Sequence, residues 1–344
     1  MTRVLVVDDS AVVRRVITEE LSKFSDIEVV GGAIDPFMAR EKIAKLQPDV
    51  LTLDIEMPRM DGLSFLEKLM KHHPLPVVVV SSLAAENSEN ALRALSLGAV
   101  EIVSKPGSQF SAPDVAGELI RAIRTAARAK VDSRNAPPKL SAVLNIPSQL
   151  ETTHKVIAIG ASTGGTRAIE SVLAQFPVNS PGIVICQHMP PGFTASFAER
   201  LNSICKIRVS EAKHGDSVSP GTALIAPGNQ HMLLQKSGAR YSVILKDGPL
   251  VHYQKPSVDV MFQSVARNAG KNAVGVILTG MGADGAKGLL EMRESGAQTI
   301  AQDEATCVVF GMPGEAVKLG AACEILPLQK IPGRVISLVA SDAY

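Results

Sequence analysis

Short apolar runs alternate with amphipathic segments through most of this 344-residue chain, and this alternation constrains the fold more than any other feature. Apolar runs that are each followed by a helical segment are typical of parallel sheets covered by helices on both faces. The alternation stops between residues 129 and 152, where prolines and polar residues cluster, and it resumes at residue 153. The sequence therefore predicts two α/β domains, at 1–128 and 153–344, joined by a linker at 129–152.

The first domain is expected to be a doubly wound sheet of five parallel strands. The expected strands are Arg3–Val7, Glu28–Ala33, Val50–Leu53, Val77–Ser81 and Glu101–Val103. The expected helices are Ser10–Phe24, Pro36–Leu46, Gly62–Lys71, Ala84–Leu97 and Asp114–Arg128. In sheets of this kind, functional residues gather at the carboxyl ends of the strands.

Charged and hydroxyl side chains follow the strands of the first domain. Asp8 and Asp9 follow the first strand, Asp54 the third, and Lys105 the fifth, while Ser82 follows the fourth. Any one of these acids alone is more often a solvated loop residue or a helix cap, but together they form a set at one edge. Clustered carboxylates repel one another, and a hard divalent cation such as Mg²⁺ relieves that repulsion. Asp54 is then the expected phosphoacceptor, whose carboxylate attacks phosphorus to form an acyl phosphate.

These positions also resemble the response-regulator receiver domain, over the whole of the first domain. The matching segments are Val7–Ser10, Asp54–Gly62 and Lys105-Pro106. The resemblance implies a histidine autokinase as phosphodonor, phosphoryl-binding roles for Ser82 and Lys105, and Mg²⁺ ligands at Asp9, Asp54 and the backbone carbonyl of Glu56, beside Asp8 of the same cluster. Many receivers carry an aromatic switch residue where this chain has Ile102, so the relay of phosphorylation is left open.

The second domain is expected to be a Rossmann-like α/β domain with a β-hairpin insert. The expected strands are Val156–Ile159, Ile183–Cys186, Ala223–Ala226, Met232–Gln235, Tyr241–Leu245, Val274–Leu278 and Gln298–Ala301. The expected helices are Gly165–Gln175, Phe193–Ser203, Ser257–Asn268, Gly285–Ser295, Gly314–Leu319 and Ile331–Val339. Short β segments and glycine-rich turns between residues 218 and 251 indicate hairpins at one side of the main sheet.

Ser162 lies in a G-x-S-x-G turn after the first strand of this domain. Alone, the pattern is weak, and an ordinary glycine-rich βα turn explains it equally well. A phosphate cradle is the other alternative, but Thr166 and Arg167 follow Gly165 where a Walker motif has Lys and Ser or Thr, and no G-x-G-x-x-G is present. However, His188 and Asp284 also follow expected strands, so a nucleophile, a base and an orienting carboxylate meet at one edge. The order Ser…His…Asp differs from the Ser…Asp…His order of α/β-hydrolases, which argues against that fold.

Other residues compete for the roles of base and carboxylate. We expect the remaining histidines of the second domain, His214, His231 and His252, to be surface residues. Asp216 is expected in a turn and Asp259 as a helix cap, which leaves Asp303 as the serious rival to Asp284. Glycines around Asp284 favour it, because they allow close approach to a reacting group. The expected oxyanion donors are the backbone N–H groups of Met281 first and Thr163 second.

Four segments of the second domain resemble the chemotaxis protein-glutamate methylesterases, in which a receiver domain also comes first. They are Gly160–Thr166, Gln187–Thr194, Pro256–Asp259 and Leu278–Gly282. The resemblance implies hydrolysis of glutamate γ-methyl esters on methyl-accepting chemoreceptors, with release of methanol, and often deamidation of receptor glutamines. Ala283 stands where many members carry Asn. We also expect the unphosphorylated receiver to cover the Ser162 edge.

Charge and composition argue against nucleic-acid binding, a disulfide or zinc framework, and membrane insertion. Residues 153–344 hold 17 Lys and Arg against 14 Asp and Glu, so the second domain has no basic footprint for nucleic acid. The four cysteines are scattered and contain no C-x-x-C pair, which argues against a disulfide framework or a zinc site. No apolar run is long enough for membrane insertion. We therefore expect a cytoplasmic protein with Mg²⁺ in the receiver and no cofactor for ester hydrolysis. The alternative function is a receiver-linked non-enzymatic regulator or scaffold.

Overall fold

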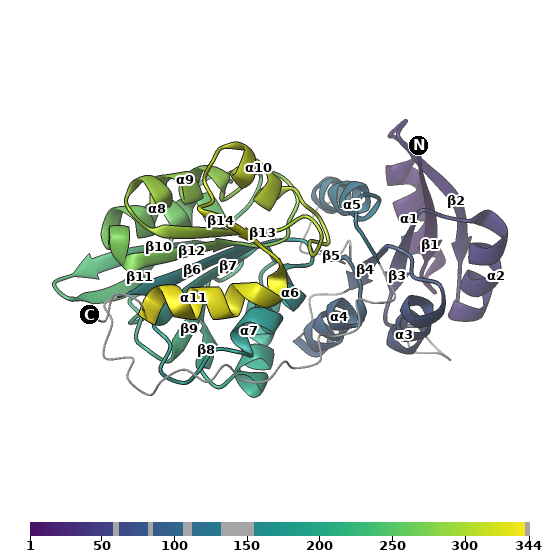
Figure 1. Ribbon diagram of the computed structural model, residues 1–344. Coiled ribbons are helices and arrows are strands. Elements are labelled where there is room, and N and C mark those ends of the chain that lie inside the picture. Colours follow the sequence, from purple (N-terminus) through teal and green to yellow (C-terminus); the bar gives the residue numbers. More distant parts are fainter. Residues whose placement is uncertain (58–61, 82–84, 106–111, 132–154, 341–344) are drawn as a thin grey trace. The chain divides into compact units, whose positions relative to one another are not determined.

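The structure is a computed structural model that describes residues 1–57, 62–81, 85–105, 112–131 and 155–340 (Figure 1). The chain divides into two compact units, Met1–Pro137 and Pro138–Tyr344. The expected linker at 129–152 lies almost wholly outside the described residues, so its boundaries remain a prediction. Each unit is built on its own parallel sheet and is described separately.

The first unit contains the expected sheet of five parallel strands, in the order β2-β1-β3-β4-β5. The strands are β1 (Thr2–Val7), β2 (Ile27–Ala33), β3 (Val50–Asp54), β4 (Val77–Ser81) and β5 (Glu101–Ser104). The helices are α1 (Ala11–Leu21), α2 (Pro36–Leu46), α3 (Gly62–His72), α4 (Ala85–Leu97) and α5 (Ala112–Ala126). The central strands β3 and β4 are buried along their full length, as expected for a parallel sheet covered on both faces.

Strand register in the first unit aligns the carboxyl ends of neighbouring strands. Val7 of β1 lies opposite Leu53 of β3, and Asp54 of β3 lies opposite Val80 of β4. The residues that follow these strands are therefore brought to one edge of the sheet. Strand pairing, more than any local preference, positions the acidic residues of this unit.

The second unit contains a seven-stranded sheet in the order β14-β13-β12-β6-β7-β9-β8, in which every neighbouring pair is parallel. Its strands are β6 (Val156–Ala161), β7 (Gly182–Gln187), β8 (Arg208–Glu211), β9 (Thr222–Ile225), β12 (Ala273–Ile277), β13 (Gln298–Gln302) and β14 (Glu324–Leu326). The hairpin β10 (His231–Ser237) and β11 (Arg240–Lys246) forms a separate two-stranded sheet. The helices are α6 (Gly165–Leu173), α7 (Phe193–Ile204), α8 (Val258–Ala269), α9 (Ala286–Glu294), α10 (Met312–Lys318) and α11 (Ile331–Ala340), with 3₁₀ turns at Gly270–Asn272 and Leu328–Lys330.

The assignment of the whole 218–251 region to hairpins was wrong in one respect. Only β10 and β11 form a hairpin, whereas β9 lies inside the main sheet and pairs in parallel with β7 and β8. Ala223, Leu224 and Ile225 are buried there, so burial on both faces of the sheet outweighs the turn signals around them. The edge strands β8 and β14 were not anticipated, because each has at most one buried residue. The equally short strands β5 and β9, with three buried residues each, were predicted.

Strand order places a switch point at the centre of the second sheet. From β6 the chain moves to β7 on one side and later returns to β12 on the other. The crevice outside the carboxyl ends of two such strands is the common ligand site of open α/β sheets. Helices α8, α9 and α10 lie on one face of this sheet and α6, α7 and α11 on the other (Figure 1). Residues that follow β6, β7 and β12 therefore meet at this edge.

Candidate active site

The turn after β6 holds Ser162 against the turn after β12. The Ser162 N–H donates to the Thr279 carbonyl at 3.0 Å, and the Gly165 N–H donates to the Ser162 carbonyl at 2.7 Å. A Cβ at Gly280 would lie 2.7 Å from the Ser162 Cβ, so only glycine permits this approach. Ser162 itself is half-buried, which leaves its hydroxyl within reach of a substrate.

His188 follows β7, and its backbone N–H donates to the Ala161 carbonyl at 3.1 Å. Its side chain is 5% exposed and lies beside Asp284, with 2.7 Å between His188 Nε2 and Asp284 Oδ2. The other ring nitrogen, Nδ1, is buried and has no hydrogen-bond partner among the described residues. The pair thus leaves one imidazole nitrogen available for proton exchange.

Asp284 is held by the start of α8 as well as by His188. Its Oδ2 accepts the Val258 N–H at 2.7 Å, and its Oδ1 accepts the Ser257 hydroxyl at 2.8 Å and the Asp259 N–H at 3.0 Å. Burial alone would raise the pKa of Asp284, but the hydrogen bonds from His188, Asp259 and Ser257 and the charge of His188 together lower it. The carboxylate is therefore kept ionised beside the imidazole.

Sequence reasoning gave the start of α8 no role at this site. Ser257 is the N-cap of α8, and its hydroxyl accepts from the Val260 N–H at 3.4 Å. The sequence signal was the Pro256–Asp259 segment, which entered only as part of the family resemblance. A helix N-terminus favours a carboxylate through its free N–H groups and its dipole. This explains why the acid at 284, more than 20 residues away, is bound there.

Gln187 is a second residue that sequence reasoning missed. Its side-chain amide Nε2 donates to the carbonyls of Ser162 at 2.9 Å and His188 at 3.0 Å, and the residue is 3% exposed. One buried amide thus joins the turn of the expected nucleophile to the turn of the expected base. A Cβ at Gly165 would overlap the Gln187 Oε1, so this glycine gives the side chain its room.

We expect Gln187→Glu to lower the rate of ester hydrolysis about tenfold or more, because the change replaces a shared donor with a second acceptor facing two carbonyls. The melting temperature should also fall. Gln235→Glu, at an exposed position of β10, is the matched control and should leave both quantities unchanged. Steady-state kinetics and thermal unfolding measure the two effects. Wild-type kinetics in the Gln187 variant would contradict this role.

The residues considered as alternatives to His188 and Asp284 make other contacts or are exposed. His231 is 5% exposed, so its assignment to the surface was wrong: Nδ1 accepts the Ser257 N–H at 3.2 Å, and Nε2 lies 2.9 Å from the Pro249 carbonyl. His214 is exposed, as expected. Asp303 accepts the Thr306 N–H at 3.0 Å and the Thr306 hydroxyl at 2.6 Å, which commits it to its own loop.

Asp259 is not the cap of α8, although its position at the start of the helix predicted that role. The carboxylate accepts the Gly288 N–H of α9 at 2.6 Å and pairs with His252 Nε2 at 3.1 Å, while Ser257 serves as the cap. It is a buried residue because α8 packs against α9. Burial raises the pKa of Asp259, opposed by the Gly288 N–H, and the Asp284 charge raises it further.

The expected oxyanion donors lie on the turns that flank Ser162. Met281 is half-buried after β12, and its N–H has no hydrogen-bond partner among the described residues. The preceding Gly280 N–H is already bonded to the Val309 carbonyl at 3.1 Å. Thr163 is buried, and its carbonyl accepts the Thr279 hydroxyl at 3.0 Å. The oxyanion roles of Met281 and Thr163 remain predictions. In the same loop, the carbonyl of Ala283 accepts the Ala286 N–H at 3.1 Å.

The first unit brings its acidic residues together at the sheet edge. Carboxylate oxygens of Asp8, Asp9 and Asp54 all lie within 4.8 Å of one another. Lys105 Nζ lies 2.8 Å from Asp54 Oδ2 and 3.8 Å from Asp8 Oδ2, and the Glu56 N–H donates to Asp54 Oδ1 at 2.9 Å. Ser82 lies outside the described residues, so its phosphoryl-binding role remains a prediction.

This acidic cluster fits a Mg²⁺ ion. Asp8 Oδ2 is buried without a hydrogen-bond partner among the described residues, and hard carboxylate oxygens are the ligands that Mg²⁺ prefers. Burial raises the pKa of Asp8 to about 6, opposed by the Ser10 N–H, and the Asp54 charge raises it further. Burial would lower the pKa of Lys105, but its hydrogen bond and charge interaction with Asp54 raise it. The site therefore needs additional positive charge when Asp8 is ionised.

We expect the affinity for Mg²⁺ to fall as the pH drops below about 6, because Asp8 then takes up a proton. The native state holds this proton more tightly than the unfolded state, so the metal-free protein should lose stability as the pH rises through about 4 to 6. Calorimetric Mg²⁺ titrations at pH 5, 6 and 8 measure the first effect. Asp8→Asn should bind more weakly and lose this pH dependence, whereas pH-independent wild-type binding would refute the argument.

Two known protein families match this chain. Residues 157–335 match the family described as CheB methylesterase, and residues 4–111 match the response regulator receiver domain. A protein-glutamate methylesterase/protein-glutamine glutaminase of Syntrophus aciditrophicus is 58% identical over 98% of this chain and 99% of its own length. The Escherichia coli K12 protein of the same description is 53% identical, over 98% of this chain and 97% of its own.

Structural comparison leads to the same family. The crystal structure of the Thermotoga maritima CheB methylesterase catalytic domain superimposes with a TM-score of 0.53 and 41% identity, over 54% of this chain and 98% of that one. Among the described residues, no helix has the length and apolar character needed to cross a bilayer. Family match, full-length relatives and catalytic-domain structure agree, and the chain belongs to the CheB methylesterase family, with a receiver domain in front of its methylesterase domain.

Proposed function

We propose that this protein is a serine hydrolase that removes methyl groups from glutamate γ-methyl esters of chemoreceptors, releasing methanol, and that it deamidates receptor glutamines during adaptation in chemotaxis. The printed names of its full-length relatives describe both activities. The observation that carries the proposal is the buried pair of His188 and Asp284, 2.7 Å apart at the sheet edge that also bears Ser162. This pair and the family membership favour an enzyme over the alternative of a non-enzymatic regulator or scaffold.

In the proposed reaction, Ser162 Oγ attacks the ester carbonyl carbon while His188 takes the hydroxyl proton. His188 then gives this proton to the departing methoxide, which leaves as methanol, and water hydrolyses the acyl-enzyme by the same route. Because Nε2 faces Asp284, Nδ1 is the nitrogen that exchanges the proton. Asp284 stabilises the imidazolium, and Met281 N–H with Thr163 N–H stabilises the oxyanion. For a glutamine, ammonia is the leaving group.

The receiver is proposed to control this reaction through Asp54. A histidine autokinase donates the phosphoryl group, which Lys105 and Ser82 bind, and Mg²⁺ when bound neutralises charge at the site through Asp8, Asp9, Asp54 and the Glu56 carbonyl. We further propose that the unphosphorylated receiver occludes Ser162 and that phosphorylation shifts the population toward an open state. The sequence motifs and the receiver match support phosphorylation, and the occlusion rests on the joining of the two domains in one chain.

We expect a small-molecule phosphodonor to raise methanol release from methylated receptor membranes by about tenfold or more, because an open state is typically a minor one before a switch acts. Asp54→Asn should release methanol at the basal rate and lose the stimulation. Asp26→Asn, a receiver acid that pairs with Arg124 at the surface, is the matched control and should keep the stimulation. Equal rates with and without phosphodonor would overturn the switch, and no methanol release at all would overturn the hydrolase.

A further inference from the structure

A tight turn beside the candidate active site has an unusual composition. Val251 and Gln254 exchange two backbone hydrogen bonds, of 3.1 and 2.9 Å, across the two residues between them. Those residues, His252 and Tyr253, have φ values of 50° and 63°. Turns with two consecutive left-handed residues normally use Gly, Asn or Asp, because a larger side chain is strained there. Such strain persists where surrounding contacts hold it, and it is often found at functional sites.

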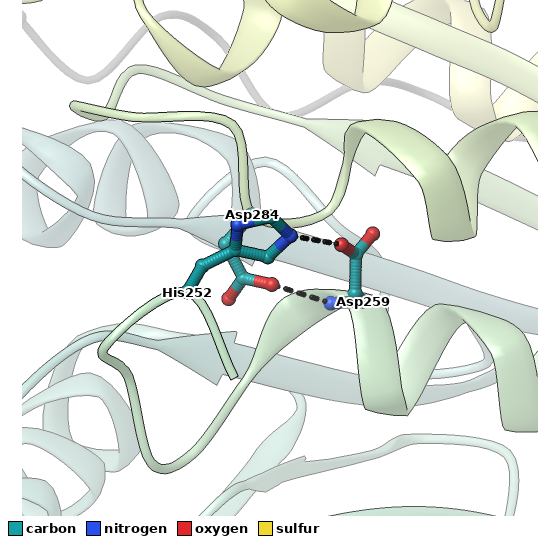
Figure 2. A group of neighbouring side chains, drawn as sticks. All are labelled: His252, Asp259 and Asp284. Carbon is teal, nitrogen blue, oxygen red and sulfur yellow. Dashed lines mark hydrogen bonds and ion pairs between the residues drawn. The ribbon is translucent and has the colours of Figure 1, made fainter. Parts of the chain in front are cut away.

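The contacts that hold this turn lead to Asp284. His252 Nε2 lies 3.1 Å from Asp259 Oδ2, and the Asp259 N–H donates to Asp284 Oδ1 at 3.0 Å (Figure 2). Ligand atoms of these three side chains all lie within 4.8 Å of one another. The turn is therefore fixed to the same first turn of α8 that holds the carboxylate of the expected triad.

A metal ion is a poor explanation of this group. The two oxygens of Asp284 already accept hydrogen bonds from His188, Ser257, Val258 and Asp259. A cation bound there would have to displace at least one of these donors. The contact between His252 Nε2 and Asp259 Oδ2 instead suits an anchor that fixes the turn in place.

The anchored turn exposes apolar side chains. Tyr253 is 77% exposed and Leu250 is 60% exposed, which makes them two of the most exposed large hydrophobic residues among those described. The base of the loop is fixed as well, since Lys255 Nζ lies 2.8 Å from Asp247 Oδ1 and the Pro249 carbonyl lies 2.9 Å from His231 Nε2. An exposed tyrosine on a fixed turn is a frequent anchor of protein interfaces, because its large ring has few rotatable bonds and the backbone is already ordered.

We infer that the Val251–Gln254 turn is a docking element for the protein substrate, in which Tyr253 and Leu250 bind apolar side chains that flank the esterified glutamate. This inference rests on the proposed function. A methyl ester is too small to supply the binding free energy by itself, so specificity must come from the protein surface around it. The turn is within reach of that surface, because a ring nitrogen of His252 lies within 4.8 Å of a carboxylate oxygen of Asp284.

The experiment compares two substrates with the full-length protein in the presence of phosphodonor. Methylated receptor membranes present the whole docking surface, whereas a short peptide with a glutamate γ-methyl ester presents only the reacting group. Tyr253→Ala should lower the ratio of kcat/KM for receptor to kcat/KM for peptide about tenfold, as for a typical interface anchor. Tyr253→Phe should retain most of the ratio, since the apolar ring makes the contact.

The control is Val178→Ala. Val178 is 65% exposed but precedes β7, so it lies at the opposite edge of the sheet and should leave the ratio unchanged. His252→Ala should lower the ratio in the same direction, and the double variant with Tyr253→Ala should fall no further than Tyr253→Ala alone, because the anchor acts through the tyrosine. If the wild-type protein is active on both substrates but Tyr253→Ala leaves the ratio unchanged, the docking element is overturned and the proposed function is not. Absence of wild-type activity on both would instead overturn the proposed function.

Discussion

Ser162→Ala should lower methanol release by about four or more orders of magnitude, while the protein remains folded. Removal of a triad nucleophile typically costs this much, because the members of a triad act as one unit. Ser162 is half-buried in a turn where its N–H and carbonyl make three structural hydrogen bonds, with Thr279, Gly165 and Gln187, and none of them involves the hydroxyl. Loss of the hydroxyl should therefore abolish attack on the ester with little change in melting temperature.

The matched control for this variant is Ser203→Ala. Ser203 is an exposed residue of α7 whose hydroxyl donates to the Arg200 carbonyl at 2.7 Å, within its own helix. It should retain wild-type turnover and melting temperature. Methanol release under phosphodonor and thermal unfolding supply both readouts. A Ser162→Ala rate within tenfold of wild type would remove Ser162 from the reaction.

Asp284→Asn should lower kcat by about three to four orders of magnitude, as replacement of a triad carboxylate by its amide does elsewhere. The amide nitrogen of Asn donates a hydrogen bond and cannot accept one. If it faces His188, then His188 Nε2 either loses its hydrogen bond or must become the acceptor, which moves the ring proton to Nδ1 and prevents Nδ1 from taking the serine proton. The start of α8 suffers too, because at least one buried donor among the Val258 N–H, the Asp259 N–H and the Ser257 hydroxyl is left without an acceptor. Each such buried donor costs about 1–3 kcal/mol.

The same carboxylate should make stability depend on pH. The pKa of Asp284 is lowered by folding, so its contribution is present above the ordinary Asp pKa and is lost as the pH falls through the lower folded value. Asp284→Asn should remove this acid-sensitive part of the unfolding free energy. Asp303→Asn is the control that separates the two candidate acids. Among the described residues, the carboxylate of Asp303 accepts side-chain hydrogen bonds only from Thr306, and the Oδ1 of Asn can still accept them, so turnover should stay within tenfold. The opposite ranking of the two variants would assign the acid to Asp303.

Much of this arrangement follows from strand periodicity alone. The expected strands at 156–159, 183–186 and 274–278 are close to β6, β7 and β12, and parallel strands bring their carboxyl ends to one edge. Ser162, His188 and Asp284 therefore meet, even though up to 122 residues of chain separate them. The same reasoning located Asp8, Asp54 and Lys105 in the first unit.

The hydrogen bonds that orient these residues were beyond sequence reasoning. Gln187 ends a buried apolar strand, and nothing in its position shows that its amide turns toward two neighbouring carbonyls. His231 begins an amphipathic hairpin strand, and its burial depends on the packing of β10 against α8. Such contacts join elements that are distant in sequence, and periodicity carries no information on side-chain direction between elements. The edge strands β14 and β8 were missed because each has at most one buried residue, so no apolar run marks it in the sequence.

The most direct test of the serine-hydrolase account is to treat the phosphodonor-activated protein with a fluorophosphonate and to follow the adduct by peptide mass spectrometry. The account predicts one phosphonyl group on the peptide that contains Ser162, with methanol release lost in proportion to labelling. It also predicts that Asp284→Asn labels far more slowly, because His188 no longer activates the hydroxyl. Complete labelling at another residue, or complete labelling of Ser162 with methanol release retained, would contradict the account.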